Sequence, residues 1–157
     1  MAVKFPMATK TMILQEIVWH FNEHERSQTE LYGMVACQYK DPNGNHCGFG
    51  YCCNWGDPRV EEFLIRRNNT PIAGLREATD DNLDMLLKPW YHGHSAEFWV
   101  DVQLFHDTGS HWRKIPSLRG WRLTEQGQKH LGFLMRKWGD NNHSVEEQET
   151  RHSPGCS

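Results

Sequence analysis

The spacing of apolar side chains first predicts helices. Residues 9–25 carry apolar side chains every three to four positions, which is the period of an amphipathic helix. Asp57 followed by Pro58 is typical of a helix start, since aspartate caps and proline favours the first helical position. A further short helix is predicted from Asp80, where acidic residues suit the positive end of a helix, to the residues before Pro89.

A longer helix is predicted for residues 124–138. One side of this segment carries small or apolar side chains at helical spacing, and Gly139 is a natural stop. The expected buried stripe consists of Leu123, Gly127, Leu131, Leu134, Met135 and Trp138.

Other segments favour strands. Residues 31–39 suit a strand, although Thr29 and Glu30 could instead open a short helix there. With residues 47–55 they flank the turn sequence Asp-Pro-Asn-Gly-Asn at 41–45, which predicts a hairpin. The glycines of the second segment indicate bulges or close approach of another backbone. Residues 98–105 are rich in aromatic and β-branched side chains, so we expect a strand there, paired with residues 112–115.

These elements predict an α+β fold: an N-terminal helix, an antiparallel sheet from two hairpins, short middle helices, and a C-terminal helix packed on the sheet. The chain of 157 residues is long enough for one domain with a hydrophobic core. We expect residues 1–139 to form that single globular domain. Residues 140–157 are polar and lack apolar spacing, so we expect a disordered tail.

Cysteine usage and the lengths of the apolar runs bear on the compartment. The five cysteines are an odd number and include the adjacent pair Cys52 and Cys53, which does not suit a disulfide framework. No apolar run approaches the length of a membrane span, and no continuous apolar region follows the basic N-terminus as in a secretory signal. We therefore expect a soluble cytoplasmic protein with reduced thiols.

Basic side chains concentrate near the C-terminus. Residues 40–107 hold six Lys and Arg against eleven Asp and Glu, whereas residues 111–138 hold seven against Glu125 alone. Because Lys and Arg supply most of the sequence-independent affinity for phosphate backbones, the leading hypothesis is a small non-enzymatic binding protein for nucleic acid or another anionic partner. The alternative is a solvated basic face with no partner. The candidate contact residues are Arg113, Lys114, Arg119, Arg122, Lys129, Arg136 and Lys137.

A local motif in this basic region resembles a DNA-binding family. The string RLTEQG, which begins at Arg122, resembles the junction between the wing and the next helix in winged-helix DNA-binding proteins. The resemblance implies that Leu123 is buried, that Thr124 caps the helix and that Gly127 allows close packing. It spans only residues 121–134. The chain departs from the family because no clear helix–turn–helix pair precedes the hairpin and the glycine- and cysteine-rich segment has no counterpart there.

Histidines suggest an alternative function, as a metal-binding protein or metal-dependent enzyme. His92 and His94 would lie on one face of an extended segment, where two imidazoles can bind one Zn or Fe ion. With Glu97 they resemble the first metal motif of cupins, although the glutamate follows too closely and no second motif is found. His106 or His111 are candidates to complete the site. The competing interpretation is hydrogen-bonded or surface histidines with no cofactor.

A second set of soft metal ligands is weaker. His46, Cys47, Cys52 and Cys53 have suitable side chains, but no matching pair of ligands with zinc-site spacing follows. The chain also lacks a Gly-x-Ser-x-Gly nucleophile motif and a phosphate-binding glycine loop. The sequence thus favours a protein that is not an enzyme.

The abundant aromatic residues raise a third possibility, a homodimeric protein-interaction module. Trp and Tyr dominate binding hot spots, so any that the core leaves exposed are natural interface anchors. The candidates are Trp55, Trp90, Tyr91, Trp99 and Trp112, and the alternative is that they fill the core.

Overall fold

The computed structural model describes residues 7–25, 29–31, 34–36, 38–67, 75–76, 78 and 80–139. The expected tail at 140–157 lies outside the described residues. The helices are α1 (Lys10–Glu23), α2 (Gly48–Cys52), α3 (Pro58–Arg66), α5 (Asp80–Leu86), α6 (Ala96–Asp107) and α7 (Glu125–Gly139), with single turns η1 (Pro89–Tyr91) and η2 (Gly109–His111). The strands are β1 (Thr29–Leu31), β2 (Met34–Ala36), β3 (Trp112–Lys114) and β4 (Trp121–Leu123).

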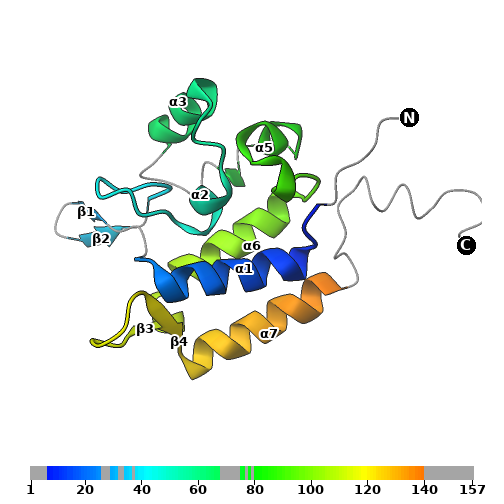
Figure 1. Cartoon of the computed structure of the whole chain (residues 1–157). Coiled ribbons are helices and arrows are strands. Elements are labelled where there is room, and N and C mark those ends of the chain that lie inside the picture. The colour runs from blue at the N-terminus through cyan, green and yellow to red at the C-terminus, as the bar shows by residue number, and fades with distance from the viewer. Residues whose placement is uncertain are drawn as a thin grey trace, which may run out of the picture.

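The architecture is α+β, with helices at both ends as predicted. Figure 1 shows α1 running through the middle of the molecule, with α7 along one side of it and the hairpin of β3 and β4 at its C-terminal end. α7 packs on both α1 and α6, and β4 packs on α1. None of the helices described is long and apolar enough to cross a bilayer.

The strands form two separate two-stranded antiparallel sheets, where we expected one shared sheet. β1 pairs with β2, and β3 pairs with β4 in a register that places Trp112 opposite Leu123 and Arg113 opposite Arg122. The expected strand at 112–115 is therefore confirmed in large part, but its partner is β4 and not residues 98–105.

The prediction of a strand at 98–105 is wrong, because this segment forms α6. Ser95 caps the helix by accepting a hydrogen bond from the Phe98 amide. The buried side chains include Phe98, Val102 and Phe105, a spacing of three to four residues that suits a helix. Because α6 is buried on most sides, it has few polar positions, and the helical period is hard to see in the sequence. Packing against the core then outweighs the β propensity of its residues.

The prediction of a return strand at 47–55 is also wrong. A single bridge joins Lys40 to His46 across the expected turn, and the chain then forms α2. The Cys47 thiol caps α2 by accepting from the Gly50 amide at 3.2 Å. The expected close backbone approach is confirmed at Gly50, where an added Cβ would lie 2.0 Å from the Tyr39 carbonyl oxygen.

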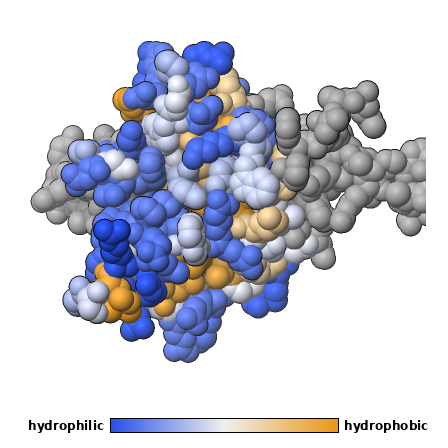
Figure 2. Space-filling view, in the orientation of Figure 1, coloured by the Kyte–Doolittle hydropathy of each residue, from blue (hydrophilic) through white to orange (hydrophobic). Residues whose placement is uncertain are grey.

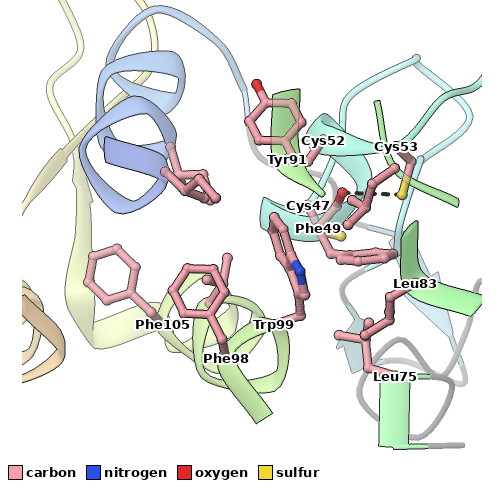
Figure 3. Packing of buried hydrophobic residues seen from close by; sticks show 14 of the residues in the cluster. Cys47, Phe49, Cys52, Cys53, Leu75, Leu83, Tyr91, Phe98, Trp99 and Phe105 are labelled. Atoms are coloured by element: carbon pink, nitrogen blue, oxygen red, sulfur yellow. Dashed lines mark hydrogen bonds between the residues drawn. The ribbon is translucent and has the colours of Figure 1, made fainter. Parts of the chain in front are cut away.

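The core centres on aromatic side chains between α1, α2 and α6. Figure 3 shows Trp99 between Phe98 on α6 and Phe49 on α2, and ring centroids of both lie 5.3 Å from that of Trp99. Cys47, Cys52 and Cys53 are free thiols buried beside this cluster. Burial raises the pKa of Cys52 and of Cys53 well above the usual value, so both are protonated components of the core.

Candidate functional site

Three of the seven predicted basic contact residues are bonded to other elements of the fold. The Arg122 Nη1 atom donates to the Asn22 carbonyl oxygen at 2.6 Å and to the Arg119 carbonyl oxygen at 3.3 Å. Beside it, Gly120 has a φ of +67°, and an added Cβ there would lie 2.5 Å from the Phe21 carbonyl oxygen. The guanidinium thus neutralises the negative C-terminal end of α1 and holds the hairpin against it.

Lys114 and Lys137 are engaged by carboxylates. The Lys114 ammonium pairs with Glu25, which also accepts from the Trp121 indole at 3.0 Å. The hydrogen bond from Lys114 lowers the pKa of the Glu25 carboxyl. Lys137 donates to Asp101 on α6 at 2.8 Å, and this bond raises the pKa of its ammonium group. These pairs connect elements of the fold.

The other four predicted basic residues are exposed on the hairpin and on α7. Within the part of the chain that the structure describes, Arg113, Arg119 and Arg136 form no ion pair, and Lys129 pairs only with Glu125 of the same helix, at 3.4 Å. Phe133, 52% exposed, lies on the same helix face as two of these cations. We call this set the hairpin–α7 surface: Arg113, Arg119, Lys129, Phe133 and Arg136.

At the junction between hairpin and helix, the Thr124 cap and the close packing at Gly127 are as the winged-helix resemblance implied, whereas Leu123 is only partly buried. Leu123 is partly buried against the core, and the Thr124 hydroxyl caps α7 by accepting from the Gly127 amide at 3.1 Å. An added Cβ on Gly127 would lie 2.2 Å from the His111 carbonyl oxygen, so the glycine allows the close packing. The helix before the hairpin does not suit a recognition helix, because the surface of α6 carries carboxylates such as Asp101.

The histidines predicted to bind metal have separate hydrogen-bond partners. The His92 Nε2 atom lies 2.9 Å from the Leu87 carbonyl oxygen, and the His94 Nε2 atom lies 2.8 Å from the Ala8 carbonyl oxygen. Glu97 is exposed and lies 3.7 Å from Lys137. No group of three His, Cys, Asp or Glu side chains among the described residues is arranged to hold a metal ion. Metal binding at His92, His94 and Glu97 stays a prediction, with no geometry to support it.

The remaining candidate ligands are also separated. The His106 Nδ1 atom lies 2.9 Å from Asp107, while the His111 Nδ1 atom lies 2.9 Å from the Phe105 carbonyl oxygen. Both rings are buried, and His106 also contacts the ring of Phe21. Their contacts connect α6 to α1 and to η2.

The structure buries three of the aromatic residues that were candidates for an interface. Trp99, Trp112 and Tyr91 belong to the core, whereas Trp90 is 38% exposed. The most exposed tryptophan is Trp19 on α1, at 64%, which the sequence did not single out. Figure 2 shows hydrophobic side chains along the seam between α1 and α7 and near the hairpin, on a face that is otherwise mostly hydrophilic.

A pocket that the sequence did not predict is lined by the C-terminal end of α1, by the turn before α2 and by residues in and after α2. Its volume is about 320 Å³. We call it the histidine–aromatic pocket. Its lining consists of His20, His24 and Glu25 from the end of α1, Gly44, Asn45 and His46 from the turn, and Tyr51, Trp55 and Lys88.

Stacked rings form much of this lining. The centroid of the His20 ring lies 4.1 Å from that of His24 and 3.9 Å from that of Tyr51, and both pairs of rings are stacked. The His46 and Trp55 rings, from the turn and the residues after α2, have centroids 5.7 Å apart. Burial, followed by the nearby His24, lowers the pKa of His20 to about 3. Burial, followed by Lys40, lowers the pKa of His46 to about 4, so both imidazoles are neutral near pH 7.

A carboxylate beneath the pocket holds its tyrosine. Glu16 on α1 accepts hydrogen bonds from the hydroxyl groups of Tyr51, at 3.2 Å, and Tyr91, at 2.7 Å. The Trp90 indole donates to its other oxygen at 3.2 Å. Burial raises the pKa of Tyr51 to about 12, so the phenol stays protonated and serves as a donor to Glu16. The bonds from Tyr91 and Trp90 hold the Glu16 carboxylate in place, and this carboxylate in turn holds the hydroxyl end of Tyr51.

Sequence reasoning missed the pocket because its parts are far apart in the chain. The only local signal is the spacing of His20 and His24, four residues apart in a predicted helix and hence on one face. His46 joins them only because the 41–45 turn folds over α1. Comparison of the chain with protein-family models, curated proteins and solved structures finds no match.

Proposed function

We propose that this chain is a non-enzymatic binding protein that engages nucleic acid through the hairpin–α7 surface. The observation that carries the proposal is the stripe of Lys129, Phe133 and Arg136 on α7. These residues are four and three positions apart, so two cations flank an exposed aromatic ring on one helix face.

This combination suits a phosphate backbone with accessible bases. Lys and Arg neutralise phosphates and release counterions, while an exposed aromatic ring provides a stacking surface for a base. Arg113 and Arg119 on the adjoining hairpin extend the positive charge beyond the helix. Contacts of this kind position a strand without reading its sequence.

The proposal is tested by fluorescence anisotropy with labelled oligonucleotides of about 20 nucleotides, single-stranded and duplex, at salt concentrations from about 50 to 300 mM. We expect affinity to fall steeply with salt, since each phosphate contact contributes about one unit to the slope of log affinity against log salt. The double variant Lys129→Glu and Arg136→Glu is expected to weaken binding at least tenfold at low salt and to flatten the slope by about two units.

A control is Arg66→Gln, which removes one positive charge from α3, outside the hairpin–α7 surface. It is expected to leave affinity and slope unchanged. A flat salt dependence of the unaltered protein, or equal weakening by the control, would show that this surface does not bind phosphate backbones.

A further inference from the structure

The histidine–aromatic pocket is the strongest candidate for a second binding site. It is concave, its volume of about 320 Å³ is at the small end of the range for small-molecule sites, and it gathers side chains from three parts of the chain. None of the five side chains of the hairpin–α7 surface lines it. The side chains that would bind a ligand in this pocket therefore differ from those that would bind a strand on the hairpin and α7.

The rings of the lining favour a flat ligand. The rings of Trp55 and His46 line the pocket with centroids 5.7 Å apart and an interplanar angle of 37°, and the Tyr51 ring is held in place by Glu16. Stacking on such faces accepts any planar heterocycle, because every such ring has a π face. The Trp55 indole N–H already donates to the Gly50 carbonyl oxygen at 2.7 Å, so this ring is fixed before a ligand arrives.

The imidazoles add polar groups that fit the edge of a heterocycle. Neither His20 nor His46 forms a side-chain hydrogen bond with another residue in the described ranges. A neutral imidazole offers one N–H donor and one acceptor nitrogen. The amide and ring nitrogen atoms of a nucleobase present complementary donors and acceptors along one edge.

The charges around the pocket favour an anionic substituent on that ring. Lys88 lines the pocket, with its ammonium group 5.7 Å from the centroid of the Tyr51 ring, and forms no ion pair among the described residues. Lys40 lies nearby, over the Trp55 ring at 5.3 Å. The single carboxylate of the lining, Glu25, is already paired with Lys114, so among the described residues Lys88 is the charged group of the lining that can meet an anion.

We propose that the histidine–aromatic pocket binds a nucleotide, with the base stacked against Trp55 and His46 and the phosphate at Lys88. The shared chemistry is a heteroaromatic base with a phosphate. Two sources supply it, a free mononucleotide and an unpaired base of a single strand. Either source uses a different set of residues from the proposed phosphate contacts on the hairpin and α7.

The test follows the imidazole signals of His20 and His46 by NMR while the full chain is titrated with AMP, GMP, CMP or UMP. We expect at least one nucleotide to shift these signals saturably. Adenosine and inorganic phosphate are titrated as matched probes, and each is expected to bind about tenfold more weakly than the nucleotide that contains it, because stacking and the phosphate contact are separate contributions.

Variants assign the binding to the pocket. His46→Ala and Lys88→Gln are each expected to weaken nucleotide binding about tenfold, whereas Arg66→Gln is expected to leave it unchanged. Because Lys88 is exposed, we expect Lys88→Gln to fold even if His46→Ala does not. The affinity for an oligonucleotide with one abasic site is then compared with the affinity for its intact parent. Weaker binding would indicate that the pocket takes an unpaired base of a strand, and equal binding would indicate that it takes a free nucleotide.

The possible failures are distinguishable. If none of the four nucleotides shifts the two imidazoles at millimolar concentration, or if inorganic phosphate shifts them equally, the pocket is not a nucleotide site. Salt-dependent oligonucleotide binding that the Lys129→Glu and Arg136→Glu variant removes would then still support the function of the hairpin–α7 surface. Saturable nucleotide binding without oligonucleotide binding would support the pocket and contradict that function.

Discussion

The histidine–aromatic pocket and the hairpin–α7 surface both gather ionisable side chains, but in opposite states of solvation. In the pocket, burial lowers the pKa of His20 to about 3 and that of His46 to about 4, so the rings are neutral. On the surface, the side chains of Lys129 and Arg136 are exposed to solvent. Water and salt therefore act strongly on the hairpin–α7 surface and weakly on the rings of the pocket.

This difference separates two modes of binding. Exposed cations attract an anion over long range, and added salt screens that attraction. Neutral imidazoles and aromatic rings act at contact distance, so their contribution depends little on salt. Each of the four predictions below changes residues that hold either the pocket or the hairpin–α7 surface in place. They run from the largest expected effect to the smallest.

The largest effect is expected for Gly50→Ala, in the helix that carries Tyr51 into the pocket. The added methyl group would lie 2.0 Å from the carbonyl oxygen of Tyr39, and that backbone atom cannot move without displacing α2. We expect the free energy of unfolding, measured with urea, to fall by about 3 kcal/mol. Gly56→Ala is the control, since the nearest atom there is 3.7 Å away; equal losses would show that close packing at Gly50 is not the cause.

A smaller loss in the free energy of unfolding is expected for Gly127→Ala, a substitution in the helix that carries part of the hairpin–α7 surface. Its methyl group would lie 2.2 Å from the His111 carbonyl oxygen and push α7 away from η2, although alanine also favours a helix by about 1 kcal/mol. We expect a net loss of about 2 kcal/mol by the same measurement.

Gly132→Ala is the matched control within α7. Its nearest neighbour, at 3.3 Å, is the mobile end of the Arg136 side chain. This variant is expected to gain about 0.5–1 kcal/mol. A gain at both positions would contradict the close packing of α7 on η2.

Glu16→Ala should reduce stability by about 1–3 kcal/mol, because the hydroxyl groups of Tyr51 and Tyr91 lose their charged acceptor. We also expect weaker nucleotide binding, since the Tyr51 ring is no longer held. Salt-dependent binding by the hairpin–α7 surface should stay the same. The neighbouring exposed residue Gln15 supplies the control, Gln15→Ala, which should alter neither property.

The smallest effect near pH 7 is expected from the two pocket histidines, whose contribution to stability changes only as the pH falls below about 6.5. The pKa values of His20 and His46 are lowered in the folded state, so the unfolded chain binds more protons between about pH 6.5 and the folded values of about 3 and 4. Stability contributed by the neutral rings is full above about pH 6.5 and decreases as pH falls toward 4. Thermal unfolding of the variant with His20→Gln and His46→Gln should show a flatter pH profile than the unaltered protein. An unchanged profile would show that these rings are not buried as neutral groups.

The sequence predicted the helices that local signals define. Thr9 caps α1, Asp57 caps α3 and Thr124 caps α7, and each cap precedes apolar side chains at helical spacing. The same reasoning failed for α6, where burial of Trp99 and Phe105 on different sides leaves little contrast between faces. It failed for α2 because five residues are too few to show a period.

For the candidate sites, the sequence shows where the basic residues lie along the chain. It does not show which of them are bonded within the fold and which face solvent. It singled out seven basic residues as one candidate set, yet Lys114, Arg122 and Lys137 contact other parts of the fold. The partners of the last two residues, the Asn22 carbonyl group and Asp101, are distant in the chain, so no local pattern could reveal them.

The sequence by itself determined the amphipathic helices at both ends, the α+β class and the basic character of the C-terminal third, because these depend on neighbouring residues and on composition. The tertiary structure decided that residues 98–105 form a buried helix, which cations stay exposed, and that His20, His46 and Tyr51 share one pocket. The physical reason is that burial, and with it the charge state of an imidazole or the choice between helix and strand, depends on side chains brought together from distant parts of the chain.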